Sequence, residues 1–207
     1  PAAEAAAWFL KLARSAEGRA ARGALWAAAL ADSASPARDF MAYAQDRNRP
    51  WSARRTAMQL AGATGDASLV PELERMARAA GPEPVRERKD EGDLAKGAVD
   101  ALATIPADAG LDALVRLAAD APRPVVRGAA LFHAAQSGDA RGVRLARETA
   151  ERESEPDELR KSATFALLNR EDVSDADRAW ARALLPKATA RSMRDVILMG
   201  LAQHGTD

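Results

Sequence analysis

The stretch "PVVRGAALFHAAQSGDA", residues 124–140, decides the fold because the chain contains two further copies of its pattern. An earlier copy reads "WSARRTAMQLAGATGDA" (residues 51–67), and a later one reads "DELRKSATFALLNREDV" (residues 157–173). Each copy has an arginine at its fourth position, then an Ala-containing apolar run, then an acidic turn. We therefore interpret the stretch as one copy of a structural repeat rather than as a site built around His133.

Six segments of this kind follow one another along the chain, and each opens with a basic residue. The six basic residues are Arg22, Arg54, Lys96, Arg127, Arg160 and Arg194. Their separations are 32, 42, 31, 33 and 34 residues, and the longest contains the insertion "GPEPVRERKDEGD", residues 81–93. The insertion is rich in Pro, Gly and charge, so we expect a mobile, protease-sensitive loop between the two helices of the third repeat.

A second set of predicted helices alternates with these segments. Most begin with Asp, Ser or Pro, as helix N-termini prefer, and apolar residues such as Leu111, Leu114 and Leu117 follow at helical spacing. Alanine fills about a quarter of the positions, and no long window alternates polar with apolar residues. The sequence therefore predicts an all-α fold of about six antiparallel helix pairs.

These helix pairs resemble HEAT repeats of the bacterial type. The resemblance rests on an apolar residue, then Arg or Lys, two small residues and a further apolar position, as in "VRGAA". It implies a right-handed α-solenoid that spans residues 1–207 as a single domain, with a role in binding and assembly. The third copy departs from the pattern by its insertion, and the first and last fit loosely, as terminal repeats do. Armadillo and tetratricopeptide arrays are the near alternatives, but the Trp and Tyr positions typical of tetratricopeptide repeats are missing.

The amino-acid composition argues against several classes of function. The chain has 30 basic and 30 acidic residues, a balance that argues against strong, non-specific binding of nucleic acid. It has no cysteine, which excludes disulfides, thiolate nucleophiles and Cys-based metal sites. No apolar run approaches the ~20 residues that span a bilayer. Because the sequence begins at Pro1 rather than Met, we expect a processed or excised chain, either cytoplasmic or exported.

The histidines and clustered carboxylates, which could in principle be catalytic, are better explained by structural roles. His133 occupies the repeat position held elsewhere by Leu60, Leu102, Ala166 and Gly200, which predicts a buried structural histidine, and His204 lies far along the array. The carboxylates of "ERESEPDE" and "REDVSDAD" fall between helices, where solvated turns and helix caps explain them. No Gly-rich phosphate loop, serine elbow or His-Glu metal motif occurs, so we expect no enzyme, cofactor or metal site.

A stripe along the basic-anchored helices is the candidate partner-binding surface. HEAT-like arrays line their concave surface with such helices, and in the first repeat the stripe holds Arg22 and Trp26. The predicted binding residues are Trp51, Arg54, Arg55, Met58, Lys96, Arg127, Leu131, Arg160, Lys161 and Arg194. Two interpretations are open. In one, the arginines form a structural ladder to caps or carbonyls of neighbouring repeats. In the other, the stripe is a groove for an acidic or mixed partner segment.

Two classes of function also stay open. The leading hypothesis is a non-catalytic scaffold that binds another protein or a larger complex. The alternative is an enzyme similar in architecture to HEAT-like alkylpurine DNA glycosylases, with Trp51, Arg54 and Asp100 at the flipped base. The zero net charge and the 4% aromatic content count against the enzyme. A third hypothesis is that the array is a spacer segment of a larger protein.

Overall fold

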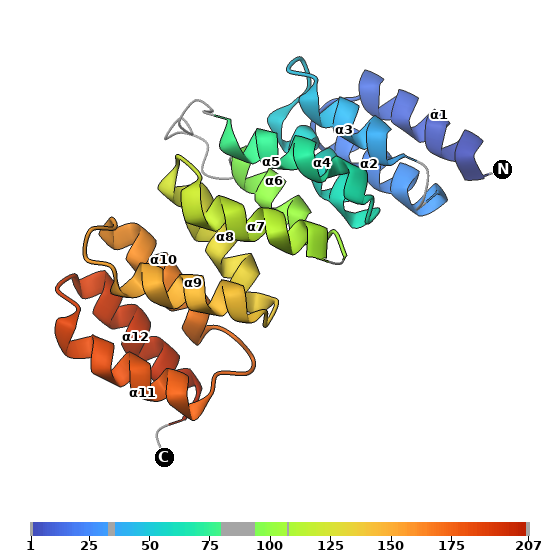
Figure 1. Cartoon of the computed structure of the whole chain (residues 1–207). Coiled ribbons are helices and arrows are strands. Elements are labelled where there is room, and N and C mark those ends of the chain that lie inside the picture. The colour runs from blue at the N-terminus through green and yellow to red at the C-terminus, as the bar shows by residue number, and fades with distance from the viewer. Residues whose placement is uncertain (1, 33–35, 80–93, 107, 206–207) are drawn as a thin grey trace. The chain divides into compact units, whose positions relative to one another are not determined.

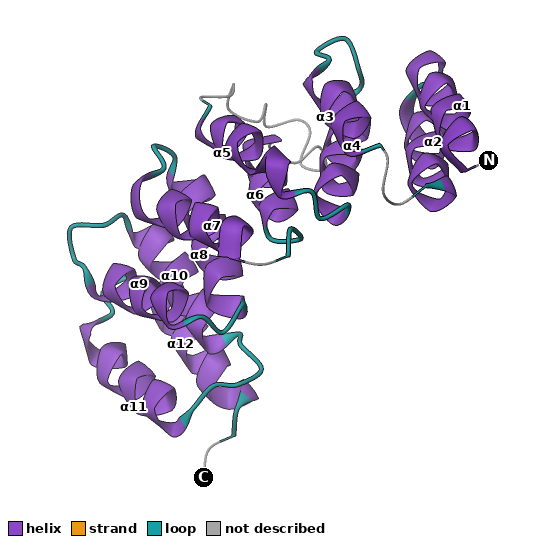
Figure 2. Ribbon diagram, turned by 45° about the vertical axis from the view of Figure 1, so that its right-hand side comes forward, coloured by secondary structure: helices purple, strands orange, loops and turns teal. Residues whose placement is uncertain are grey.

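The computed structural model describes residues 2–32, 36–79, 94–106 and 108–205 (Figure 1). These residues form twelve α-helices and two short 3-10 turns, and no strand occurs among them (Figure 2). The prediction of an all-α fold is confirmed. The predicted insertion loop, residues 81–93, lies outside the described residues.

The chain divides into two compact units, Pro1–Ala113 and Leu114–Asp207. The division falls inside helix α7 (Asp108–Asp120).

The first unit is built from helix pairs. Its helices are α1 (Ala2–Ser15), α2 (Gly18–Ala31), α3 (Ala37–Gln45), α4 (Trp51–Ala63), α5 (Val70–Arg78) and α6 (Leu94–Leu102), and the 3-10 turn η1 (Ala67–Leu69) precedes α5. Helix α1 packs on α2, α3 on α4, and α5 on α6. In addition α2 contacts α4 and α4 contacts α6, so the second helices of successive pairs pack on one another.

The second unit repeats this arrangement. Besides the last part of α7, it contains α8 (Pro124–Gln136), α9 (Ala140–Glu151), α10 (Asp157–Leu168), α11 (Asp175–Leu184), the 3-10 turn η2 (Leu185–Lys187) and α12 (Arg191–Gln203). Helix α9 packs on α8 and α10, and α11 contacts α10 and α12. Helices α8, α10 and α12 contact one another in that order, as α2, α4 and α6 do in the first unit.

The Gly-Asp turn of the repeated stretch has the same geometry at two places. Gly65 follows α4 with φ 74°, and Gly138 follows α8 with φ 75°, in the left-handed region that glycine adopts without steric cost. The next residue, Asp66 or Asp139, accepts a hydrogen bond from the backbone N–H two residues later, at 2.9 and 2.8 Å respectively. One glycine therefore ends a helix and one aspartate begins the next.

The core combines alanine with a smaller number of large side chains. The largest fully buried side chains are Phe40, Leu25, Met41, Met58, Leu73, Leu102, Leu117, Leu131, Leu159, Leu167, Leu168 and Met193. Buried alanines fill most of the positions between them. Because alanine is small, neighbouring helices can approach closely, and some helical glycines lie at such contacts. A Cβ atom on Gly142 of α9 would lie 2.2 Å from the carbonyl oxygen of Ala134 in α8.

Candidate functional site

Three arginines of the predicted stripe make the same bond at three different helix pairs. The Nε atom of Arg54 donates to the carbonyl oxygen of Ala44 in α3, at 2.7 Å. The Nε atom of Arg127 donates to Ala118 in α7 at 3.2 Å, and that of Arg160 donates to Ala150 in α9 at 3.1 Å. In each case the arginine lies on the second helix of a pair and the acceptor lies on the first. We call these three bonds the arginine ladder.

The ladder satisfies backbone groups that would otherwise lack a partner. All three acceptors lie in the last turn of their helix, where carbonyl groups have no intrahelical donor. A guanidinium at this end also interacts favourably with the negative pole of the helix dipole. The acceptor lies on the preceding helix of the same pair, whereas the sequence interpretation expected a neighbouring repeat.

Arg127 adds a second link, to an acidic turn. Its Nη1 and Nη2 atoms donate to the two carboxylate oxygens of Glu155, at 2.8 and 2.7 Å, and both side chains are mostly buried. The hydrogen bonds from Arg127 lower the pKa of Glu155. Glu155 belongs to the turn between α9 and α10, for which the sequence predicted a solvated role. That prediction is wrong for Glu155, because the turn folds back onto Arg127.

Arg55 and Lys96 share one acidic partner. The Nη2 atom of Arg55 in α4 and the Nζ atom of Lys96 in α6 each lie 3.3 Å from a carboxylate oxygen of Asp100, also in α6. Asp100 was the carboxylate proposed for the glycosylase-type alternative, and here it sits between two cations. Arg54, proposed for the same site, points instead to α3 and lies over the Trp51 ring, 5.6 Å from its centroid.

The remaining stripe residues are either charged and near the surface or apolar and buried. Lys161 pairs with Glu158 on the same helix, while Arg22 and Arg194, in the first and last pairs, are exposed. Met58 and Leu131 are fully buried. These two side chains belong to the core, so they offer no contact area to a partner. On both helices the apolar residue four positions after the ladder arginine is buried between packed helices.

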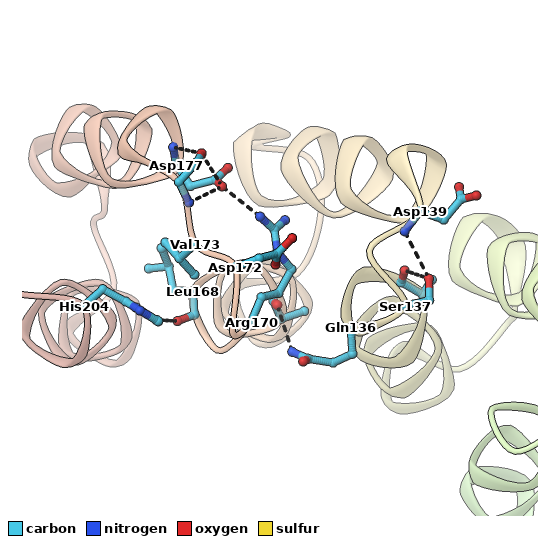
Figure 3. A network of polar contacts seen from close by, with 12 residues as sticks. Gln136, Ser137, Asp139, Leu168, Arg170, Asp172, Val173, Asp177 and His204 are labelled. Atoms are coloured by element: carbon cyan, nitrogen blue, oxygen red, sulfur yellow. Dashed lines mark hydrogen bonds and ion pairs between the residues drawn. The ribbon is translucent and has the colours of Figure 1, made fainter.

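The two histidines have different surroundings. His133 is half-buried, whereas the sequence predicted full burial, and its ring meets Phe132 edge to face with centroids 5.4 Å apart. Leu60, Leu102, Ala166 and Gly200, at the equivalent positions, are buried as expected. His204 is the residue that directly follows α12, and its Nε2 atom lies 2.8 Å from the carbonyl oxygen of Leu168 in α10 (Figure 3).

A buried ionic network that the sequence analysis missed lies in the second unit (Figure 3). Arg170 and Asp177 are each only 6% exposed at the side chain, and Arg170 Nη2 lies 2.8 Å from Asp177 Oδ2. Asp177 also pairs with Arg147 of α9 and forms a capping box with Ser174 at the start of α11. Burial raises the pKa of Asp177, but the hydrogen bonds from Ser174 and the charges of Arg170 and Arg147 outweigh it, so the net pKa is lowered.

This network corrects the interpretation of "REDVSDAD". The cap role expected for its carboxylates holds for Asp177, but the expected solvation does not. The network reaches further along α9, because Arg147 also lies over the Trp180 ring and Trp180 Nε1 donates to Glu151 at 2.6 Å. It therefore fastens α11 to α9 and to the turn after α10.

Sequence reasoning also missed most of the exposed large apolar side chains. They are Trp8, Leu12, Trp26, Leu30, Val125, Leu198 and Met199. Four of them belong to α1 and α2, where they come as two pairs spaced by four residues on the side opposite the buried residues. The signal was present in "GRAARGALWAAALA", where Trp26 and Leu30 lie at helical spacing on the face opposite the buried residues.

Comparison with known proteins adds no assignment: no protein-family model, curated protein or solved structure matches the chain. Among the described residues, no helix combines the length and apolar character needed to cross a membrane.

Proposed function

We propose that the chain is a non-catalytic scaffold whose helix pairs form a HEAT-like, right-handed α-solenoid and whose exposed helix faces bind another protein. Two observations support the array. The arginine ladder recurs at three helix pairs, as expected for a repeated unit. Within each unit, the second helices of successive pairs pack on one another, as neighbouring repeats of a solenoid do.

The exposed apolar side chains of the first helix pair form the proposed binding surface. Trp8 is 60% exposed, Trp26 53% and Leu30 85%. Single apolar residues are normal on a protein surface, but two tryptophans on one helix pair are an unusual concentration. Tryptophan is also the residue type most enriched among the anchors of protein interfaces.

The same contacts weigh against the alternatives. A DNA glycosylase-type enzyme would use the carboxylate of Asp100, which already interacts with Arg55 and Lys96. It would also use Arg54, which is bound to the end of α3. A spacer segment would need no exposed tryptophans.

Affinity capture from the native organism, read by quantitative mass spectrometry, tests the proposal. The wild-type chain is compared with Trp8→Ala/Trp26→Ala and with a control, Arg182→Ala, at an exposed position of α11. We expect proteins that are retained by the wild type and the control and lost by the double variant. Equal capture by all three chains, or release of damaged bases from DNA by the wild type, would contradict the proposal.

A further inference from the structure

One face of α2 combines two arginines with two large apolar side chains. Arg19, Arg22, Trp26 and Leu30 follow at helical spacing, and all four are exposed. The opposite face of α2 is buried and consists of Ala21, Ala24, Leu25 and Ala28. We call the four exposed residues the α2 stripe.

The positive charge of the α2 stripe is not compensated within the helix. The sequence of α2, "GRAARGALWAAALA", contains no acidic residue. Neither Arg19 nor Arg22 forms an ion pair with any other residue that the structure describes. Three other basic residues of the predicted stripe have an acidic partner, because Arg55 and Lys96 each pair with Asp100, and Arg127 pairs with Glu155.

We propose that the α2 stripe binds a short acidic segment of a partner protein, through carboxylates at Arg19 and Arg22 and apolar side chains at Trp26 and Leu30. This inference rests on the proposed scaffold function and names the partner's chemistry. Arginine binds carboxylates through two parallel hydrogen bonds, which gives both attraction and orientation. Tryptophan supplies apolar contact area beside them.

The size of the stripe favours a segment over a folded partner or a second copy of the chain. From Arg19 to Leu30 the helix rises roughly 16 Å. Two large apolar side chains fall well short of the ~800 Å² that each partner buries in a standard interface. A peptide of about 12 residues, folded as a helix of comparable length, covers the whole stripe.

A displayed library of random 12-residue peptides, panned on the full chain, is the probe. We expect enriched peptides to carry two or more carboxylates next to large apolar residues. The affinity of the best peptide is then measured by fluorescence anisotropy. Arg19→Glu/Arg22→Glu should weaken it at least about tenfold, because repulsion replaces attraction. Trp26→Ala should weaken it roughly thirtyfold, as loss of an anchor does.

The control is Arg182→Glu/Lys187→Glu, which changes the net charge equally at exposed positions of the second unit and should leave affinity unchanged. Folding is checked by circular dichroism, and glutamate near the start of α2 favours the helix. The inference is overturned by enrichment of basic or uncharged peptides, by no enrichment, or by equal affinity in all variants. Trp26-dependent self-association, or binding to anionic vesicles in place of peptides, overturns it too. If the chain still captures its partner protein with Arg19→Glu/Arg22→Glu but loses it when Trp8 is replaced, this inference is wrong. The scaffold proposal would then still stand.

Discussion

The arginine at the equivalent position of each repeat has different surroundings in different helix pairs. Arg54, Arg127 and Arg160 reach the last turn of the preceding helix, whereas Arg22 and Arg194 are exposed. The sequence analysis placed these basic residues on one stripe and left open whether they form a ladder or a groove. The distinction depends on whether a carbonyl lies within reach of the guanidinium, and residue spacing alone does not give that distance.

Replacing Arg160 should destabilise the fold. Arg160 is 7% exposed, so Arg160→Met removes the bond to Ala150 and leaves a carbonyl oxygen without its donor. We expect the free energy of unfolding to fall by about 1–3 kcal/mol, measured by urea titration. The matched variant Arg22→Met, at the equivalent but exposed position, should change it by less than about 0.5 kcal/mol. Equal effects of the two would argue against a structural ladder.

Replacing Asp177 should destabilise the second unit in a pH-dependent way. Asp177→Asn leaves Arg147 and Arg170 without their shared carboxylate, which should cost about 3 kcal/mol at pH 7. The folded pKa of Asp177 is lowered, so its ionised form stabilises the fold above the unfolded pKa of about 3.9. This stabilisation is lost as the pH falls through the folded pKa, so wild type and variant should converge there.

Thermal unfolding at several pH values measures this difference. Asp175→Asn is the control, because its carboxylate is almost fully exposed. A constant difference between wild type and Asp177→Asn down to the lowest pH would refute the assignment.

At the level of elements, local sequence predicts where the chain turns better than how closely the helices pack. The Gly-Asp turns follow from backbone conformation and capping, which are properties of neighbouring residues. The role of a helical glycine depends instead on another helix. Gly142 lies against the backbone of α8, whereas a Cβ on Gly23 would meet no atom within 4 Å. Burial of Asp177 escaped prediction for the same reason, since its partners come from α9 and from the turn after α10.

The two glycines should therefore respond oppositely to alanine. Gly142→Ala puts a Cβ into the backbone of α8, so helix α9 must shift, and we expect a loss of about 1–3 kcal/mol in unfolding free energy. Gly23→Ala fills open space in the exposed part of α2 and should add about 0.5–1 kcal/mol, because alanine favours the helix. Denaturant titration of both variants gives the signs. A stabilising Gly142→Ala would show that α8 and α9 are not in backbone contact.

For the molecule as a whole, the sequence predicted an all-α chain, and that part is confirmed for the described residues. The single array over residues 1–207 remains a prediction beside the two compact units. Repeat arrays unfold cooperatively when neighbouring repeats are strongly coupled. A single array should therefore give one calorimetric transition, which Asp177→Asn moves as a whole. Two resolved transitions, of which only one moves, would show two independently folding domains.

The central claim is that the ladder arginines maintain the fold while the exposed anchors of the first helix pair bind a partner protein. Its most direct test is the affinity of a captured partner for two variants, measured at a temperature where both are folded. We predict that Arg160→Met binds the partner as the wild type does, and that Trp8→Ala/Trp26→Ala binds it at least about tenfold more weakly. Full affinity in the tryptophan variant, with loss of affinity in Arg160→Met, would contradict the account.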